Sequence, residues 1–233
     1  MKRETLQSVL AARRDKRPLA LATEVETGEQ ALVDGEIRTG DLVLAGAALD
    51  AVRAALAEDR SGMIETEAGR LFVQVFNPPL RMIIVGAVHI AQALVPMATI
   101  AGYDVTVIDP RRAFATDARF PGTTVLTDWP DDAMTGLAPD RRTAIVTLTH
   151  DPKIDDPALA VAVRSPAFYI AALGSRRTHA KRVERLAEAG FSDDEIGRIA
   201  GPAGLPIGAR SPAEIALSVL AECTAALHGV AAR

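Results

Sequence analysis

The segment Asn77-Pro78-Pro79 constrains the fold of this chain more than any other feature, because the sequence pattern changes there. Neither proline can continue a strand ladder or enter the interior of a helix, so a linker between two domains is expected. Beyond it, apolar runs typical of buried strands alternate with segments long enough to be helices. The expected strands are residues 80–85, 105–108, 125–126, 143–148 and 168–173. This alternation predicts a parallel sheet with right-handed helical crossovers over residues 80–233.

The first 77 residues show a different mixture of elements. Residues 4–14 and 49–56 have the apolar spacing of helices, and residues 19–25 are typical of a strand. Residues 63–66 and 71–75 predict a hairpin that closes around Glu67-Ala68-Gly69. We therefore expect an α/β protein, in which a small N-terminal α+β domain over residues 1–77 precedes a C-terminal Rossmann-like parallel sheet.

Composition excludes several classes of protein. The 233 residues carry a formal net charge of -4, which argues against a general nucleic-acid-binding protein. No apolar run is long enough to span a membrane, and no signal-peptide core follows the charged first six residues, so a cytoplasmic protein is expected. The single cysteine, Cys223, excludes an internal disulfide and a multi-cysteine metal site. It lies in the helix that the capping box Ser211-Pro212-Ala213-Glu214 opens, where we expect it to pack as a hydrophobe.

Polar residues and glycines follow the expected strands at the edge where ligands bind. In an open parallel sheet, ligands lie beyond the carboxyl ends of the strands. The residues of interest after the four longer strands are Gly86 and His89, then Asp109, then His150, and finally Gly174, Ser175 and His179. Three of the four histidines in the chain therefore belong to one edge, which makes this edge the candidate binding site.

A basic cluster opens the segment after residues 168–173. Ser175 precedes the expected helix, and Arg176, Arg177, His179, Lys181 and Arg182 lie on its opening turns. Unpaired N–H groups give a helix N-terminus a partial positive charge, so cations are locally disfavoured there unless an anion is bound. The cluster therefore predicts a phosphate site. The alternative interpretation is a solvated basic helix face.

The first turn of the sheet resembles a dinucleotide-binding fingerprint. Gly86-Ala87-Val88-His89-Ile90-Ala91 follows the pattern Gly-x-Gly-x-x-Gly/Ala, and Asp109 lies at a distance suited to a ribose hydroxyl. Val88 replaces the second glycine, whose absent side chain lets a pyrophosphate approach the backbone. NAD(P) is therefore not expected as a cofactor. The turn can instead serve packing only, and Asp109 can simply pair with Arg111.

His150 precedes a group of carboxylates with two interpretations. With Asp151, Asp155 and Asp156 it could act as a general base or ligate a metal. Alternatively, Asp151-Pro152 begins a turn and Asp156 caps a helix expected over residues 157–164. Joint binding of a divalent ion by the three histidines of the edge is a further alternative, but they do not share one element, and we predict no metal site.

Several segments together resemble a known family. They are Leu148-Thr149-His150-Asp151-Pro152-Lys153, Asp155-Asp156-Pro157-Ala158-Leu159, the stretch from Leu173-Gly174-Ser175 to Lys181-Arg182, and Ile207-Gly208-Ala209-Arg210 with Pro212-Ala213-Glu214-Ile215-Ala216. Their combination is similar to the XdhC/CoxI family of accessory proteins, which serve the maturation of xanthine dehydrogenase and related molybdenum hydroxylases. The resemblance covers about residues 80–228.

The resemblance implies a carrier rather than an enzyme. Such a protein receives molybdenum cofactor, as molybdopterin or its nucleotide form, shields it and assists its transfer into apo xanthine dehydrogenase or a related hydroxylase. The phosphate of that pterin cofactor fits the expected anion site. The residues expected to bind it are Gly86, His89, Asp109, His150, Gly174, Ser175, Arg176, Arg177, His179 and Lys181. A homodimer or a pair with an XdhC homologue is a further expected assembly.

Two departures from the family pattern matter for cofactor binding. Val88 replaces a usual glycine, and Ala45-Gly46-Ala47-Ala48 stands where members usually carry Gly-Gly-Cys. A thiolate is a natural ligand for molybdenum, and Ala48 cannot supply one. Either the chain holds cofactor through the phosphate end alone, or it is an interaction or regulatory paralogue without cofactor. A third hypothesis, an NAD(P)-dependent oxidoreductase, would use Asp109 on the ribose and His150 as acid or base.

Overall fold

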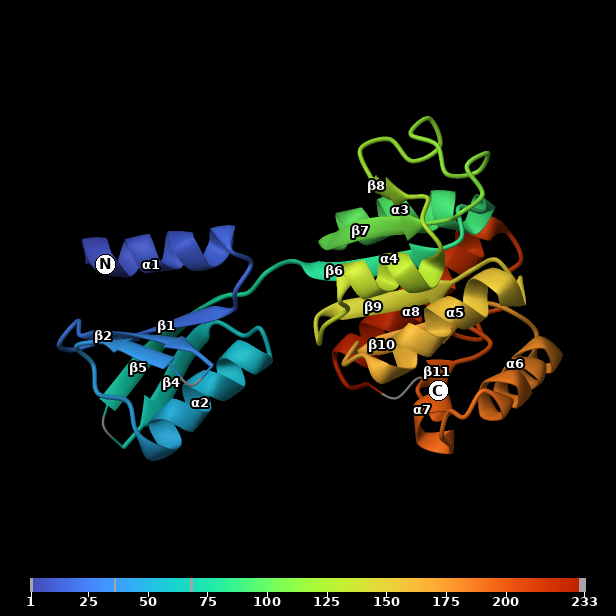
Figure 1. Cartoon of the computed structure of the whole chain (residues 1–233). Helices are drawn as coiled ribbons and strands as arrows, with labels where there is room; N and C mark the ends of the chain where they lie inside the picture. Colours follow the sequence, from blue (N-terminus) through green and yellow to red (C-terminus); the bar gives the residue numbers. More distant parts are fainter. Residues whose placement is uncertain (1, 36, 68, 231–233) are drawn as a thin grey trace. The chain divides into compact units, whose positions relative to one another are not determined.

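The computed structural model describes residues 2–35, 37–67 and 69–230. The chain divides into two compact units, Met1–Pro78 and Pro79–Arg233, and the division falls in the proline-containing linker (Figure 1). Each unit has a hydrophobic core of its own, as expected of separate domains.

The first unit is a five-stranded antiparallel sheet covered on both faces. Its elements are α1 (Arg3–Arg14), β1 (Leu19–Glu24), β2 (Gln30–Asp34), β3 (Ile37–Gly40), α2 (Gly46–Ala57), β4 (Gly62–Thr66) and β5 (Gly69–Phe76), with the strand order β3-β2-β1-β5-β4. Successive side chains of a strand point to opposite faces. Ala20 and Ala22 of β1 therefore pack with α2, whereas Leu19 and Leu21 pack with α1. This is why β1 is apolar without alternation.

The second unit is a six-stranded parallel sheet with the order β11-β10-β9-β6-β7-β8. Its strands are β6 (Leu80–Val85), β7 (Tyr103–Ile108), β8 (Thr124–Leu126), β9 (Thr143–Thr147), β10 (Tyr169–Ala172) and β11 (Ile199–Ala200). The chain builds outward from β6 to β8 and then returns to place β9 on the other side of β6. This is the strand order of a doubly wound sheet, and it puts the topological switch point between β6 and β9.

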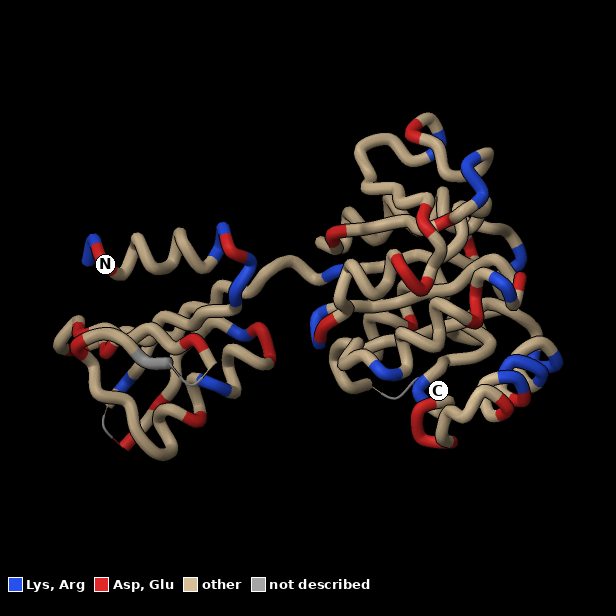
Figure 2. The backbone as a smooth tube through the Cα atoms, in the orientation of Figure 1, with Lys and Arg blue, Asp and Glu red and all other residues tan. Residues whose placement is uncertain are grey.

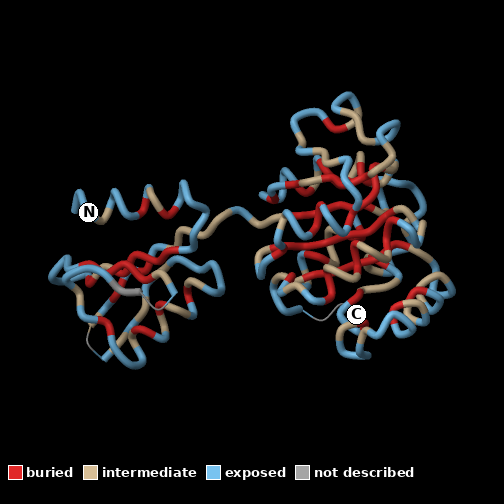
Figure 3. The backbone as a smooth tube through the Cα atoms, viewed as in Figure 1, coloured by how far each residue is buried: buried red, intermediate tan, exposed pale blue. Residues whose placement is uncertain are grey.

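Helices cover both faces of this sheet (Figure 1). They are α3 (His89–Ile100), α4 (Pro130–Leu137), α5 (Pro152–Arg164), α6 (Arg176–Glu188), α7 (Asp193–Gly197) and α8 (Pro212–Leu227). Met82 and Ile84 of the central strand pack with α3 and α8, and Ile83 and Val85 pack with α4 and α5. Figure 3 shows the resulting buried strands between helices that are exposed on their outer sides.

The structure confirms the predicted fold class and corrects one helix start. The helix expected over residues 157–164 begins at Pro152, because Asp151 caps it and Pro152 takes the favoured first position. Pro157, which suggested the later start, lies inside the helix. The residues predicted to form the hairpin do pair, as β4 and β5, although its turn includes Ala68, which lies outside the described residues. None of the helices in the described part of the chain combines the length and apolarity needed to cross a membrane.

Candidate functional site

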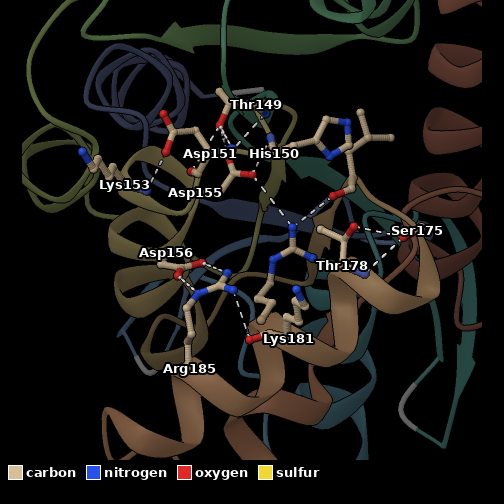
Figure 4. Close-up of polar contacts among 12 residues, drawn as sticks. Thr149, His150, Asp151, Lys153, Asp155, Asp156, Ser175, Thr178, Lys181 and Arg185 are labelled. Carbon is tan, nitrogen blue, oxygen red and sulfur yellow. Dashed lines mark hydrogen bonds and ion pairs between the residues drawn. The ribbon is translucent and has the colours of Figure 1, made fainter.

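The candidate site is a pocket of about 210 Å³ between the first turns of α5 and one face of α6, named here the α5–α6 pocket. It adjoins the loop that follows β9, at the carboxyl edge of the sheet (Figure 4). Its lining consists of His150, Pro152, Asp155, Asp156, Arg177, Thr178, Lys181, Arg182 and Arg185. Nearly all of these side chains are charged or polar, so the pocket is suited to an ion rather than to an apolar ligand.

Asp155 holds the loop between β9 and α5 in place. Its Oδ1 accepts hydrogen bonds from Thr149 Oγ1 (2.7 Å) and the Thr149 amide (3.3 Å), and its Oδ2 accepts one from the His150 amide (3.0 Å). His150 has a φ of 60°, in the left-handed region that is uncommon for residues other than glycine. The three bonds to Asp155 stabilise this conformation and keep His150 at the pocket.

A buried ion pair forms the inner wall of the pocket. Arg182 Nη2 lies 3.9 Å from Asp155 Oδ2, and both side chains are only 2% exposed. Burial raises the pKa of Asp155, against the hydrogen bonds from Thr149 and the charge of Arg182. Arg182 Nη2 also donates to the Leu173 carbonyl at 3.0 Å. Within the described residues, Nε and Nη1 of Arg182 have no hydrogen-bond partner.

The other cations of the pocket lie along α6, where lysines and arginines gather (Figure 2). Arg185 donates to both oxygens of Asp156, with Nε–Oδ2 and Nη2–Oδ1 distances of 2.5 and 3.0 Å, so its charge is already paired. Arg177 and Lys181 are exposed, and their side chains form no ion pair in the described part of the chain. Four cations and two carboxylates give the lining a formal charge of +2.

Three predicted residues at the start of α6 lie outside the pocket lining. Ser175 is the N-cap and accepts the Thr178 amide at 3.1 Å. Gly174 has a φ of 150°, and a Cβ there would lie 3.1 Å from Thr178 and 3.8 Å from His150 Nδ1. Gly174 thus lets His150 and the first turn of α6 approach closely. Arg176 is exposed to solvent.

The three histidines of the edge do not form one site. His150 lines the pocket, and His89 is the exposed first residue of α3. His179 packs against Gly201, where an added Cβ would clash with His179 Nδ1. Burial, helped by the charge of Arg182, lowers the pKa of His179. No group of three His, Cys, Asp or Glu side chains among the described residues could hold a metal ion.

Asp109 and Gly86 shape the first turn of the sheet. Both carboxylate oxygens of the buried Asp109 already accept hydrogen bonds, from the Ala87 amide (2.8 Å) and from the amide and guanidinium of Arg111. Burial opposes ionisation, but these donors outweigh it and lower the pKa of Asp109. Gly86 has a φ of 112°, and a Cβ there would lie 2.6 Å from Thr149 Cγ2. The turn is closely packed. Asp109 pairs with Arg111, which is the alternative that the sequence offered to binding a ribose.

The structure assigns the capping of α5 differently from the sequence prediction. Asp151 is the N-cap and accepts the Lys153 amide at 3.0 Å, whereas Asp156 binds Arg185. The prediction that Asp156 caps this helix was therefore wrong, because the helix starts earlier. Cys223 is fully buried, as predicted, and Ser211 and Glu214 form the predicted capping box.

Among the lining residues, His150, Arg177 and Lys181 were predicted to bind the cofactor, Arg182 was placed in the basic cluster, and Asp155 and Asp156 were considered as partners of His150. The lining residues that sequence reasoning missed are Pro152, Thr178 and Arg185. Positions 178, 181, 182 and 185 are separated by three and four residues, so they lie on one face of a helix. That spacing was the available signal. It separates the pocket face of α6 from Arg176 and His179.

Comparison with known proteins places this chain in a family. Residues 82–223 match the XdhC Rossmann domain. The molybdenum cofactor insertion chaperone PaoD of Escherichia coli is 35% identical over 147 residues, which are 63% of this chain and 40% of PaoD. A protein of Bacillus subtilis described as a probable xanthine dehydrogenase subunit is 31% identical over 153 residues, which are 65% of this chain and 44% of that protein. The chain thus spans less than half the length of these relatives.

A solved structure shares the fold. The crystal structure described as a xanthine dehydrogenase from Bacillus halodurans superposes with a TM-score of 0.73 at 24% identity, covering 97% of this chain and 65% of that one. At this identity the likeness concerns the fold alone. The family match spans more than half of the chain and agrees with the resemblance seen in the sequence. This protein therefore belongs to the XdhC family.

Proposed function

We propose that this protein is an accessory chaperone that binds molybdenum cofactor and assists its insertion into xanthine dehydrogenase or a related molybdenum hydroxylase. The observation that carries the proposal is the cation-lined α5–α6 pocket at the carboxyl edge of the XdhC Rossmann domain. The cofactor is a phosphate-bearing pterin, so it offers an anion that such a pocket can hold. The name of the related PaoD, a molybdenum cofactor insertion chaperone, supports the same function.

Some residues of the pocket can hold the ligand in a fixed place, and others can let it leave. Arg182 is a buried cation that Asp155 and the Leu173 carbonyl hold in one orientation, so it gives the anion a fixed partner. Arg177 and Lys181 are exposed cations, which attract an anion from solution and are weakened by salt. A ligand held partly by exposed charges can be handed on without unfolding the domain.

The test has two parts, cofactor content and delivery. The protein is purified from a molybdenum-replete host, and pterin released by oxidation is detected by its fluorescence. The loaded protein is then added to an apo-hydroxylase, and the gain of hydroxylase activity is measured. We expect pterin in the preparation and faster activation than with free cofactor. A preparation that holds no pterin, and that binds none at micromolar concentrations, refutes the carrier function.

A second candidate is an interaction or regulatory paralogue without cofactor. The observation that favours it is the lack of an accessible thiol: Ala45–Ala48 precede and open α2, and the only cysteine, Cys223, is buried. Burial raises the pKa of the Cys223 thiol to about 11, which leaves little thiolate to bind molybdenum. This candidate predicts that the chain captures an XdhC homologue or a component of a hydroxylase in a pull-down while its pterin content is nil.

A further inference from the structure

We infer that the α5–α6 pocket receives a single phosphate monoester, the phosphate end of the carried cofactor, on the two unbonded groups of Arg182, and that the pterin ring lies outside the pocket. This inference rests on the proposed function and names the part of the ligand that the pocket binds.

Arg182 is incompletely hydrogen-bonded in the described part of the chain. Its guanidinium carries five N–H donors in a fixed plane and cannot lose its charge at neutral pH. In the described part of the chain, only Nη2 has partners, Leu173 O at 3.0 Å and Asp155 Oδ2 at 3.9 Å, whereas the buried Nε and Nη1 have none. Buried donors in folded proteins nearly always have an acceptor. A tetrahedral anion supplies several acceptor oxygens to one guanidinium.

The charge of the lining matches that of a phosphate monoester. Its lysine, arginine and aspartate side chains give a formal charge of +2, from Arg177, Lys181, Arg182 and Arg185 against two carboxylates. A phosphate monoester carries about -1.5 to -2 charges at pH 7, which this lining balances. Because Arg185 is committed to Asp156, the cations left for the ligand are Arg177, Lys181 and Arg182.

The chemical character of the lining suits a phosphate group but not a pterin ring. Sites for flat ring systems are predominantly apolar and aromatic. The α5–α6 pocket offers one proline, Pro152, and one imidazole, His150, and its other side chains are ionic or carry a hydroxyl. At about 210 Å³ it is also smaller than the pockets of about 300–1,000 Å³ that enclose ligands of drug size. The ring therefore binds elsewhere.

The placement differs from an anion bound at the end of α6. The Ser175 side chain already caps the Thr178 amide, and neither Ser175 nor Arg176 lines the pocket. The ligand instead contacts the side of α6 formed by positions 177, 178, 181 and 182. This geometry predicts different effects for two adjacent arginines on the same helix, Arg176 and Arg177, which makes a matched pair of variants.

The test is isothermal titration calorimetry of the full chain with inorganic phosphate at pH 7.5 and low salt. We expect Arg177→Ala with Lys181→Ala to weaken phosphate binding at least about tenfold, because charged hydrogen bonds are lost. Arg176→Ala and Arg177→Ala each remove one positive charge from adjacent positions. Arg177→Ala alone should weaken binding by more than about twofold, whereas Arg176→Ala should keep the affinity within about twofold of the wild type. Arg182→Met should abolish binding. If Arg182→Met fails to fold, the phosphate affinity of the double variant Arg177→Ala with Lys181→Ala tests the inference instead, since neither of these side chains belongs to the core.

A competition arm tests the place of the ring. Unphosphorylated neopterin should leave the phosphate isotherm unchanged. Absence of phosphate binding to the wild type, an equal loss in Arg176→Ala and the exposed double variant, or displacement of phosphate by neopterin would each overturn the inference. Pterin-loaded protein without phosphate binding defeats the inference but leaves the proposed function standing. Phosphate binding in a wild type that never carries pterin defeats the proposed function and leaves an anion site for another phosphate monoester.

Discussion

The buried pair of Asp155 and Arg182 gives the most demanding prediction, because its two partners are not equivalent. Asp155 accepts three hydrogen bonds besides facing Arg182, whereas Arg182 has one firm bond, to Leu173, and two unbonded donors. Removing either partner leaves a buried charge. Only the carboxylate can then become neutral by taking up a proton, because the guanidinium stays charged.

The expected changes in stability follow from this difference. Asp155→Ala strands a guanidinium that is 2% exposed and frees the amides of Thr149 and His150, so we expect a loss of about 3–5 kcal/mol in the free energy of unfolding. Arg182→Met leaves an ionised Asp155 that still has three donors, and about 1–3 kcal/mol is expected at pH 8. A surface variant, Arg164→Met, breaks an exposed 3.4 Å pair and should cost under about 1 kcal/mol.

The pH dependence has a definite sign. The pKa of Asp155 is already raised by burial, and loss of the attractive Arg182 charge raises it further. A raised folded-state pKa means that, between this pKa and that of the unfolded chain, the native state binds more protons, so stability grows as the pH falls through the folded-state pKa. The loss of unfolding free energy in Arg182→Met relative to the wild type should therefore be smaller at pH 5 than at pH 8. The deficit of Asp155→Ala should lack this recovery.

Urea unfolding followed by tryptophan fluorescence measures these values. Trp129 is the only tryptophan of the chain and lies in the Pro79–Arg233 unit, so the signal reports unfolding of that unit alone. A loss of less than about 1 kcal/mol for Asp155→Ala, no larger than that of Arg164→Met, would refute the account of Asp155 as the support of the pocket. An unchanged deficit of Arg182→Met at pH 5 would refute the proposed uptake of a proton.

Three further predictions concern positions away from the buried pair. Cys223 should resist alkylation at pH 8 until the protein unfolds, because the thiol is buried and burial raises its pKa to about 11. Alkylation is measured by mass spectrometry, and rapid reaction of the native protein would contradict this prediction. Ser211→Ala should lower stability by about 0.5–2 kcal/mol in urea unfolding through loss of the capping box, and an unchanged midpoint would count against it. Gly86→Ala should destabilise the Pro79–Arg233 unit, because the added Cβ would lie 2.6 Å from Thr149 Cγ2. Adding Thr149→Ser removes that methyl group and should recover part of the loss. Equal urea midpoints for the single and the double variant would contradict this contact.

The sequence predicted the parts of the fold in which burial dominates the pattern. The central strand β6 is covered on both faces, so it is a continuous apolar run that is recognisable without knowledge of its neighbours. The strand β3 and the helix α4 were not predicted. Ile37–Gly40 contains one apolar residue, and its pairing with β2 depends on backbone hydrogen bonds rather than on a pattern. Pro130–Leu137 is short and contains a glycine and two aspartates, which lower its helix propensity.

The sequence predicted at which edge of the sheet the candidate site lies, but not which side chains of α6 point into it. The switch-point rule brought His150 and the basic cluster to one edge, and the structure confirms that their strands are parallel neighbours. Which cations face inward depends on how α6 packs against α5, and Arg182 is buried by that packing. In the sequence, Asp155 was considered as a partner of His150 or as a metal ligand. Its burial follows from the left-handed loop at His150, which no local pattern predicted.

The proposed function requires that this chain carries a phosphate-bearing pterin in the α5–α6 pocket. The most direct measurement is the amount of oxidised pterin released per protein chain from three preparations made in the same molybdenum-replete host: the wild type, Arg176→Ala, and Arg177→Ala with Lys181→Ala. We expect equal pterin in the first two and at least about tenfold less in the third. Equal pterin in all three, or none in the wild type, would contradict this expectation.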